Sequence, residues 1–210
     1  MTVEAVLFDF GGVFTPSPFE TVRAAAEALG IEGDVALELC FGPYDRDTDH
    51  AWHRMERGEL ALEEARLELM ALYAEAGHDV DPFTLLRSMG AVDDQRDEMV
   101  ARTIAIRERG VRTAVVTNNV REFGTGWRAM VPVDDLFDEI VDSSEVGMRK
   151  PDPRIYHLAL ERLGGIDPHA AVLLDDAPGN IAAAEAIGVR GVIVGPDRVA
   201  AMRELELLLE

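Results

Sequence analysis

Short apolar runs alternate with helical patterns along most of the chain. Runs rich in Val, Leu, Ile or Phe predict five buried strands, at residues 3–10, 112–119, 140–147, 170–177 and 190–197. The run at 140–147 is the weakest of them. Helical patterns lie between and after these runs, at residues 93–110, 152–165, 178–188 and 198–210. Strands that alternate with helices favour an α/β fold with a parallel sheet flanked by helices.

The segment from residue 16 to residue 90 breaks this alternation. It carries helical patterns at residues 19–30, 60–77 and 81–90, and no run in it predicts a strand. We therefore expect a Rossmann-like core made of residues 1–15 and 91–210. We expect an all-helical unit, residues 16–90, inserted after the first strand.

The charge of the chain limits its partners. Lys and Arg number 20 and Asp and Glu number 40, so the formal net charge is −20. Such a field repels nucleic acid and anionic lipid, and we expect neither as a partner. It also repels a phosphate substrate unless a metal ion or a lysine reverses the charge locally. A homodimer is an open alternative, since Met130, Val131 and Leu136 suit a core and an interface equally.

The location expected for the protein is cytoplasmic. No apolar run approaches the roughly 18 residues that span a bilayer, and no basic region precedes the first strand. Cys40 is the only cysteine, so no disulfide forms within the chain, which fits a reducing compartment. It lies in an apolar stretch typical of a helix end, and we expect a small buried residue rather than a nucleophile.

Polar side chains follow four of the predicted strands. In open parallel sheets ligands bind beyond the carboxyl ends of the strands, so these side chains meet at one edge. Any one of them has an ordinary explanation, such as capping the next helix. Together they supply three carboxylates, one ammonium, one hydroxyl and amide groups. They are Asp9, Thr117, Asn118, Asn119, Lys150, Asp175 and Asp176.

This set predicts a metal ion and a phosphate group. Clustered carboxylates take up protons unless a cation holds them. Oxygen ligands suit Mg²⁺, and no Cys or His pattern near these residues indicates zinc. The lysine adds a second positive charge for an anionic substrate. The hydroxyl of Thr117 and the backbone N–H that follows it suit phosphate oxygens.

Four motifs carry a family resemblance: "FDFGGVFT", "VVTNN", "GMRKPD" and "LLDDAPGN", in this order between residues 8 and 180. The chain resembles the haloacid dehalogenase (HAD) superfamily, phosphatase branch. The helical insertion is similar to the small cap domain of that family. The "GGV" form and the stretch "WHRMERGEL" look most like the subgroup that contains the N-terminal phosphatase domain of soluble epoxide hydrolase.

The resemblance implies the metal ligands. Asp9 would be a nucleophile that forms an aspartyl-phosphate, and it would also bind Mg²⁺. Asp176 would ligate the ion directly. Asp175 would act through a water, or by contacting the ligands of the ion without touching the ion itself. The carbonyl oxygen of Gly11 would be a further ligand, which needs no side chain.

The resemblance also implies the groups that hold a small phosphorylated substrate. Thr117 and the amide of Asn118 would bind the transferring phosphoryl group. Lys150 would bridge the nucleophile and the phosphate and offset charge in the transition state. The turn at Gly12 would direct backbone N–H groups at the phosphate. Asn180 would orient its loop or start the next helix.

The chain departs from the family pattern at Gly11, where the family has a second aspartate. That aspartate protonates the leaving oxygen and later activates water, which is worth roughly 10²- to 10⁴-fold. In one interpretation the protein is a phosphatase for a good leaving group, such as an acyl phosphate or a sugar 1-phosphate. Alternatively a substrate group, a water, Thr15, His53 or Glu56 replaces the acid.

Two further interpretations stay open. One is a HAD-fold binding or regulatory protein with little turnover. The other is a metal-free 2-haloacid dehalogenase, against which the paired acids Asp175 and Asp176 argue. Gly11 and Gly12 also fit a tight turn that needs unusual backbone angles.

Residues 41–60 are the most unusual stretch of the chain. Arg46 and Arg54 are candidates for contact with an anionic substrate. Trp52 fits an anchor of the insertion's own core, and the nearby histidines fit packed or surface residues. The loop from Phe14 to Phe19 has two prolines and fits a stiff hinge between core and insertion, and Phe14 and Thr15 are candidates to face the substrate.

Overall fold

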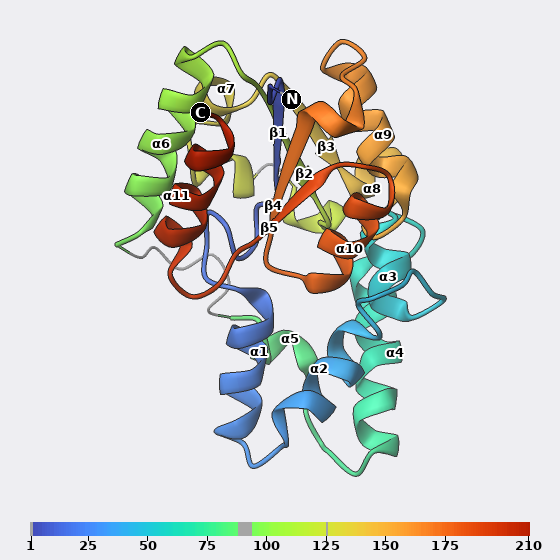
Figure 1. Cartoon of the computed structure of the whole chain (residues 1–210). Helices are drawn as coiled ribbons and strands as arrows, with labels where there is room; N and C mark the ends of the chain where they lie inside the picture. The colour runs from blue at the N-terminus through green and yellow to red at the C-terminus, as the bar shows by residue number, and fades with distance from the viewer. Residues whose placement is uncertain (1, 88–93, 125) are drawn as a thin grey trace.

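The core of the molecule is a five-stranded parallel sheet, seen in a computed structural model that describes residues 2–87, 94–124 and 126–210 (Figure 1). The strand order is β3-β2-β1-β4-β5, so the first strand lies in the centre. The sheet confirms five strands at the predicted places, but the weakest run, residues 140–147, is a strand only to Asp142 and is helical from Ser143. They are β1 (Ala5–Phe8), β2 (Arg112–Thr117), β3 (Glu139–Asp142), β4 (Ala171–Asp175) and β5 (Arg190–Ile193).

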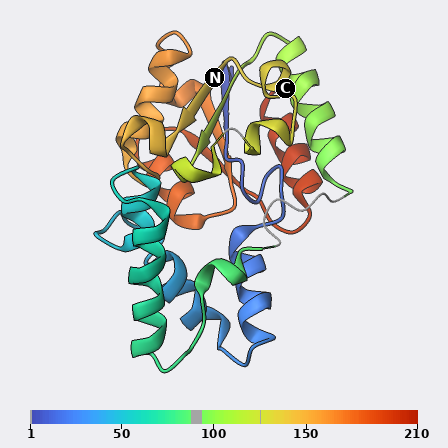
Figure 2. The ribbon, with the colours of Figure 1, turned by 180° about the vertical axis from the view of Figure 1, so that it is seen from behind.

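Helices cover both faces of this sheet, which explains why the strands are apolar without alternation. Val6 and Phe8 of β1 join a core cluster with α6 (Arg96–Glu108) and α11 (Arg198–Leu208). Ala5 and Leu7 point the other way, into a cluster with α9 (Pro153–Arg162) and α10 (Pro178–Ala186). Figure 2 shows the same layers from behind. The predicted Rossmann-like α/β fold is confirmed.

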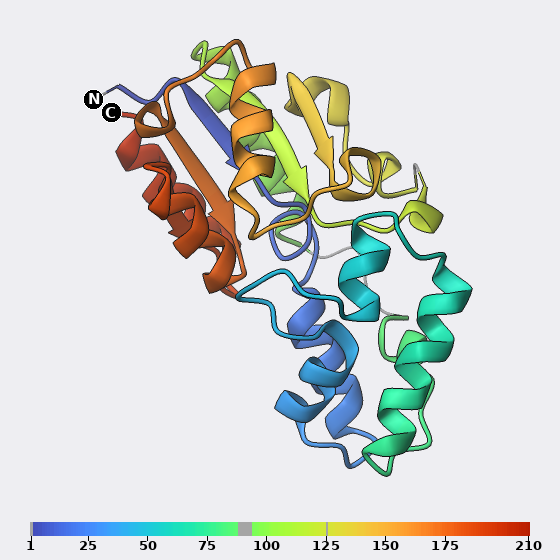
Figure 3. The same cartoon turned by 90° about the vertical axis from the view of Figure 1, so that its right-hand side faces the viewer.

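In the described residues between β1 and α6, five helices form a separate body beyond the carboxyl ends of the strands (Figure 3). We call this body, made of α1 to α5, the helical lobe. Residues 16–87 contain no strand. The predicted boundary between residues 90 and 91 lies outside the described residues. The lobe consists of α1 (Pro18–Glu27), α2 (Gly33–Phe41), α3 (Ala51–Glu56), α4 (Leu62–Glu75) and α5 (Pro82–Leu85).

The helical lobe has its own hydrophobic cluster, which includes Cys40, Trp52, Leu69 and Tyr73. Cys40 is a buried free thiol at the end of α2, as predicted. The sequence pattern missed α3, whose cap is the ring of His50. The helix predicted over residues 81–90 is described only as the short α5, and its last positions fall outside the described residues.

Short elements complete the core and connect the strands with the longer helices. Asp152 caps α9 and accepts the backbone N–H of Arg154, as its position before Pro153 predicts. In the described part of the chain, no helix has the length and apolar character needed to cross a bilayer. The short elements are α7 (Val133–Leu136), α8 (Ser143–Val146), η1 (Arg121–Phe123), η2 (Trp127–Ala129) and η3 (Pro168–Ala170).

Candidate active site

A cavity of about 420 Å³ lies between the carboxyl edge of the sheet and the helical lobe. Most of the residues predicted from the strand ends line it: Asp9, Gly11, Thr117, Asn118, Asn119, Lys150 and Asp176. Asp175 is fully buried and in contact with Lys150. Gly12 lines a neighbouring hollow and lies against Asp176. Motifs more than 100 residues apart in sequence therefore meet at one place.

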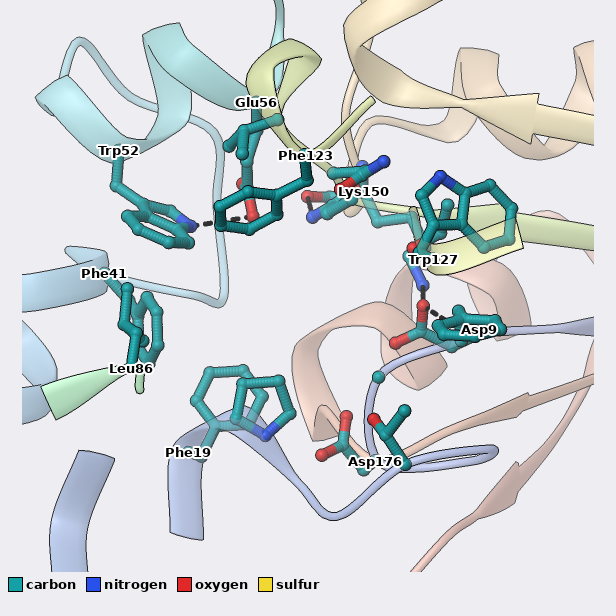
Figure 4. A pocket seen from close by; sticks show the side chains of 18 of the residues that line it. Asp9, Phe19, Phe41, Trp52, Glu56, Leu86, Phe123, Trp127, Lys150 and Asp176 are labelled. Atoms are coloured by element: carbon teal, nitrogen blue, oxygen red, sulfur yellow. Dashed lines mark hydrogen bonds and ion pairs between the residues drawn. The ribbon is translucent and has the colours of Figure 1, made fainter. Parts of the chain in front are cut away.

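Asp9 follows the central strand β1 and faces the cavity (Figure 4). Its Oδ1 accepts the backbone N–H of Phe10 at 2.7 Å and lies 2.8 Å from Lys150 Nζ. Burial raises the pKa of Asp9 to about 7, opposed by the ammonium of Lys150 and aided by the carboxylate of Asp175. A carboxylate in this position has one face held and the other toward the cavity.

Lys150 is fully buried and joins two of the three acids. Its Nζ donates to Asp175 Oδ2 at 2.6 Å and to Asp9 Oδ1 at 2.8 Å. Burial alone would lower the pKa of Lys150, but the neighbouring carboxylates of Asp175 and Asp9 outweigh it and raise the pKa. The ammonium is therefore charged and fixed beside Asp9.

The side chain of Asn118 fixes the backbone of this lysine. Its Oδ1 accepts the N–H of Lys150 at 2.8 Å, and its Nδ2 donates to the carbonyl of Lys150 at 3.0 Å. Asn119 reaches the next strand, where its Nδ2 donates to Asp142 at 2.8 Å. Because the side chain of Asn118 is used in this way, its backbone N–H and the hydroxyl of Thr117 are the groups left for an anion.

Asp175 and Asp176 end the fourth strand and have different surroundings. Asp175 accepts four hydrogen bonds. One comes from Lys150, one from the N–H of Ala177, and two from Nδ2 of Asn180, which contacts both carboxylate oxygens. The carboxylate of Asp176 accepts the hydroxyl of Ser17. Burial raises the pKa of Asp176 well above its usual range, and Asp9 and Asp175 raise it further. Asp176 is thus the acid of the pair with coordination capacity to spare.

Gly11 and Gly12 differ in backbone conformation. Gly12 has φ +71°, and a Cβ there would lie 2.2 Å from Asp176 Oδ2, so only glycine fits beneath that carboxylate. Gly11 is outside the left-handed region, and a Cβ there would lie 3.1 Å from Pro18 Cγ. The expectation of unusual backbone angles is correct for Gly12 and wrong for Gly11. The absence of a carboxyl group at position 11 is not imposed by the backbone.

The residues fit a magnesium ion. Carboxylate oxygens of Asp9, Asp175 and Asp176 lie within 4.8 Å of one another, and one ammonium faces all this negative charge. Asn180 Oδ1 is buried beside Asp175 with no protein partner in the described structure, which suits a water bound to an ion. An all-oxygen donor set of this kind is what Mg²⁺ prefers.

A buried ionic network joins the helical lobe to the lysine loop. Arg149 is fully buried, and its Nε donates to Glu56 Oε2 of α3 at 2.6 Å. Glu56 Oε1 accepts the indole N–H of Trp52 and the hydroxyl of Tyr44, both at 2.8 Å. The guanidinium also lies 4.8 Å from the centre of the Tyr44 ring. The loop that carries Lys150 is thereby fixed to the lobe.

Sequence reasoning missed several of these features. The pairing of Glu56 with Arg149 joins residues 93 positions apart, and neither motif spacing nor periodicity encodes it. Ser17 lies between two prolines, in a loop interpreted only as a hinge. Phe14 is fully buried in the core cluster and does not line the cavity, whereas Thr15 does.

The two arginines expected to meet an anionic substrate lie outside the cavity lining. Arg46 is paired with Asp45 and Arg54 with Glu68, both on exposed surfaces. His53 is buried, and its Nδ1 accepts the backbone N–H of Thr48. Burial lowers the pKa of His53 to about 3, so it is a neutral packed residue, as predicted.

Asp9 and the buried Lys150 form an ion pair at the point where the strand order of the parallel sheet reverses, which is where open α/β folds bind their ligands. A family model for haloacid dehalogenase-like hydrolases matches residues 3–188. The chain belongs to this family.

Curated relatives support the same assignment. The chain is 35% identical over 211 residues to acyl-CoA dehydrogenase family member 10 of Mus musculus, covering 98% of this chain and 19% of that protein. It is 27% identical over 220 residues to bifunctional epoxide hydrolase 2 of the same organism, covering 98% and 39%. The chain thus spans less than half the length of these two relatives. The second relative confirms the likeness to the soluble epoxide hydrolase subgroup.

A third relative has a similar length. The sesquiterpene phosphatase astK of Aspergillus oryzae is 28% identical over 219 residues, covering 99% of this chain and 97% of that protein. Among solved structures, the L-2-haloacid dehalogenase RSc1362 superposes with a TM-score of 0.67 at 20% identity, covering 100% and 99%. A HAD family enzyme of Bacteroides thetaiotaomicron, in complex with magnesium and inorganic phosphate, gives 0.61 at 19% identity, covering 93% and 96%. At these identities the structures show the fold alone.

Proposed function

We propose that this hydrolase is a Mg²⁺-dependent phosphatase that cleaves a small phosphorylated substrate through an aspartyl-phosphate on Asp9. The observation that carries the proposal is the cluster of Asp9, Asp175 and Asp176, in which Lys150 pairs with the first two and the side of Asp9 is open to a cavity. The relative whose name describes a sesquiterpene phosphatase supports the same chemistry.

The metal site would use the acids that keep free oxygens. Asp9, Asp176 and the carbonyl oxygen of Gly11 would hold the ion, with Asp175 acting through water because its own oxygens are already engaged. A bound Mg²⁺ supplies positive charge that draws the phosphate in against the net charge of the chain and stabilises the phosphoryl oxygens.

The chain's own groups perform the transfer. Asp9 attacks phosphorus with the oxygen that faces the cavity, while Phe10 N–H and Lys150 hold its other oxygen. Thr117 and the backbone N–H of Asn118 bind phosphoryl oxygens, and Lys150 offsets the charge that develops on them. Water then attacks phosphorus, releases inorganic phosphate and restores the carboxylate of Asp9.

The helical lobe would act as a cap domain, residues 16–90, over the core, residues 1–15 and 91–210. Nine described residues of the segment 16–87 line the cavity, so the lobe would supply the walls around the leaving group. The ion pair between Glu56 and Arg149 would hold the lobe and the lysine loop together while water is excluded.

Phosphate release with and without Mg²⁺ tests this proposal. The Asp9→Asn variant should lose turnover, whereas Asp49→Asn should keep it, since the Asp49 side chain is 96% exposed. Metal-free release of halide from a 2-haloacid would support the dehalogenase instead. Binding of inorganic phosphate without turnover of any phosphate ester or acyl phosphate would support the binding protein.

A further inference from the structure

The cavity around Asp9 has an aromatic and apolar wall. Figure 4 shows Trp52, Phe41 and Leu86 on the side of the cavity opposite Asp9, with Phe19 below them. Phe41 packs edge-to-face against Trp52, with ring centres 4.9 Å apart, and against Phe19 at 5.4 Å. Phe10 and Trp127 form a similar pair at 4.8 Å beside the nucleophile. Rings presented in this way favour another ring between them.

The charges of the cavity favour an uncharged leaving group. Among the described lining residues Lys150 is the single cation, and it is bound to Asp9 and Asp175. A second phosphate or a carboxylate on the leaving group would find no partner on the aromatic side. Glu56, the acid on that side, would repel it.

Apart from Asp9 and Asp176, which the proposed function uses as nucleophile and metal ligand, the described lining also offers no free acid to protonate a leaving oxygen. Gly11 has no side chain, and the hydroxyl of Thr15 donates to the carbonyl of Pro16. Glu56 lines the cavity, but both of its carboxyl oxygens already accept hydrogen bonds, from three donors that include the guanidinium of Arg149. His53 does not line the cavity. The leaving group of a substrate bound at this site must therefore depart without receiving a proton.

The rim of the cavity exposes apolar side chains that nothing in the described structure covers. Phe123 is 39% exposed and Met130 is 37% exposed, and both line the cavity mouth. An apolar ligand that extends from Asp9 past Trp127 would cover them. The cavity volume is in the range that holds a drug-sized molecule.

We infer that the substrate is an aryl phosphate, a phosphate monoester whose leaving group is a bulky, uncharged aromatic alcohol. The inference rests on the proposed phosphatase function and narrows it. A sugar 1-phosphate also has a leaving group that depends little on an acid, but the hydroxyl groups of the sugar would face the rings of Phe41 and Trp52.

The step balances without a general acid. An oxygen of Asp9 forms a bond to phosphorus as the bond from phosphorus to the aryl oxygen breaks. The aryloxide leaves with the electron pair and takes its proton from solvent afterwards. Water then forms the second bond to phosphorus, and the bond to Asp9 breaks. The sum is an aryl phosphate and water giving a phenol and inorganic phosphate.

A matched pair of substrates tests the inference. 2-Naphthyl phosphate and 2-naphthylmethyl phosphate have similar apolar groups, but only the first leaves as a stabilised aryloxide. We expect kcat/KM to be at least about 100-fold higher for 2-naphthyl phosphate, the lower end of what general acid catalysis contributes. Acetyl phosphate and glucose 1-phosphate serve as small and polar comparisons, and both should give a lower kcat/KM than 2-naphthyl phosphate.

The failures are distinguishable. Equal kcat/KM for the two naphthyl substrates, or a preference for acetyl phosphate or glucose 1-phosphate, would overturn the inference and leave the phosphatase standing. No phosphate release from any of the four would overturn both.

A variant at the rim tests the apolar contact directly. Phe123→Ala should lower kcat/KM for 2-naphthyl phosphate about tenfold more than for acetyl phosphate, because the acyl group is too small to reach the rim. Leu67→Ala is the matched control, since Leu67 is 60% exposed on α4 and does not line the cavity. An equal effect of Phe123→Ala on both substrates would contradict the inference.

Discussion

Restoring a carboxyl group at Gly11 should give this protein the acid that its cavity lacks. The Gly11→Asp variant is allowed by the backbone, because Gly11 has no positive φ. The new Cβ would lie 3.1 Å from Pro18 Cγ, so the proline must move by a few tenths of an ångström. The side chain would enter the cavity that Gly11 lines beside Asp9.

The size of the effect follows from two opposing contributions. General acid catalysis contributes about 10²- to 10⁴-fold, or about 2.7–5.4 kcal/mol at 1.36 kcal/mol per tenfold. Crowding against Pro18 costs about 1–3 kcal/mol, most of it in folding stability. We expect kcat/KM for 2-naphthylmethyl phosphate, which leaves as a basic alkoxide, to rise at least about tenfold. For 2-naphthyl phosphate, which needs no acid, it should change little.

Two further variants make the test decisive. Gly11→Asn has nearly the same shape but cannot transfer a proton, so it should not accelerate the alkyl substrate. The double variant Gly11→Asp with Pro18→Ala removes the crowding. Its kcat/KM for 2-naphthylmethyl phosphate should rise at least as much as that of Gly11→Asp alone. The reasoning is refuted if the Asn variant accelerates as much as Asp. It is equally refuted if neither Asp variant gains while both still hydrolyse 2-naphthyl phosphate.

Other consequences concern the ionic network and the metal site. Glu56→Gln leaves the buried guanidinium of Arg149 with weaker partners and should lower the free energy of unfolding in urea by about 3 kcal/mol. Glu59→Gln is the control, because the Glu59 side chain is 51% exposed, and it should lower that free energy by under about 1 kcal/mol. Equal losses would contradict a special role for the ion pair of Glu56 with Arg149. Gly12→Ala should weaken Mg²⁺ binding, measured by calorimetry, at least about tenfold, because the new Cβ would collide with the carboxylate of Asp176. Gly77→Ala is the control and should keep the affinity, because Gly77 also has a positive φ, +86°, but has open space around it. Mg²⁺ affinity should rise as pH increases from 5 to 8. The pKa of Asp9 is raised to about 7 and the pKa of Asp176 is also raised, so below these values the ion must displace protons from its ligands. Affinity independent of pH between 5 and 8 would contradict this.

The sheet and the acidic cluster are predictable from sequence for a simple physical reason. Parallel strands bury both faces, so they read as continuous apolar runs, and their carboxyl ends lie at one edge. Asp9, Asp175 and Asp176 therefore follow from strand ends alone, without any knowledge of contacts, whereas Lys150 lies beyond α8 and is indicated by its motif. The residue after each run is placed by the strand, and the strand is placed by its apolar pattern.

The character of the cavity does not follow in the same way. Trp52 looks like an anchor of the lobe, and it is one, yet it also lines the cavity, since a lobe residue can serve both surfaces. Glu56 resembles a substitute acid by residue type, and only its three donors reveal a fixed carboxylate. Phe14 and Thr15 are neighbours, yet Phe14 is buried in the core and Thr15 lines the cavity. The direction of a loop side chain depends on packing that no sequence pattern records.

The central claim is that Asp9 is the group that receives the phosphoryl group, and it is tested most directly by trapping. The wild-type protein would be mixed with Mg²⁺ and 2-naphthyl phosphate, quenched in acid during the first turnovers, and digested for mass spectrometry. The account predicts one phosphoryl group on the peptide that contains Asp9, formed only with Mg²⁺ and absent from Asp9→Asn. Phosphate release by Asp9→Asn at the wild-type rate, or a phosphoryl group on another residue, would contradict it.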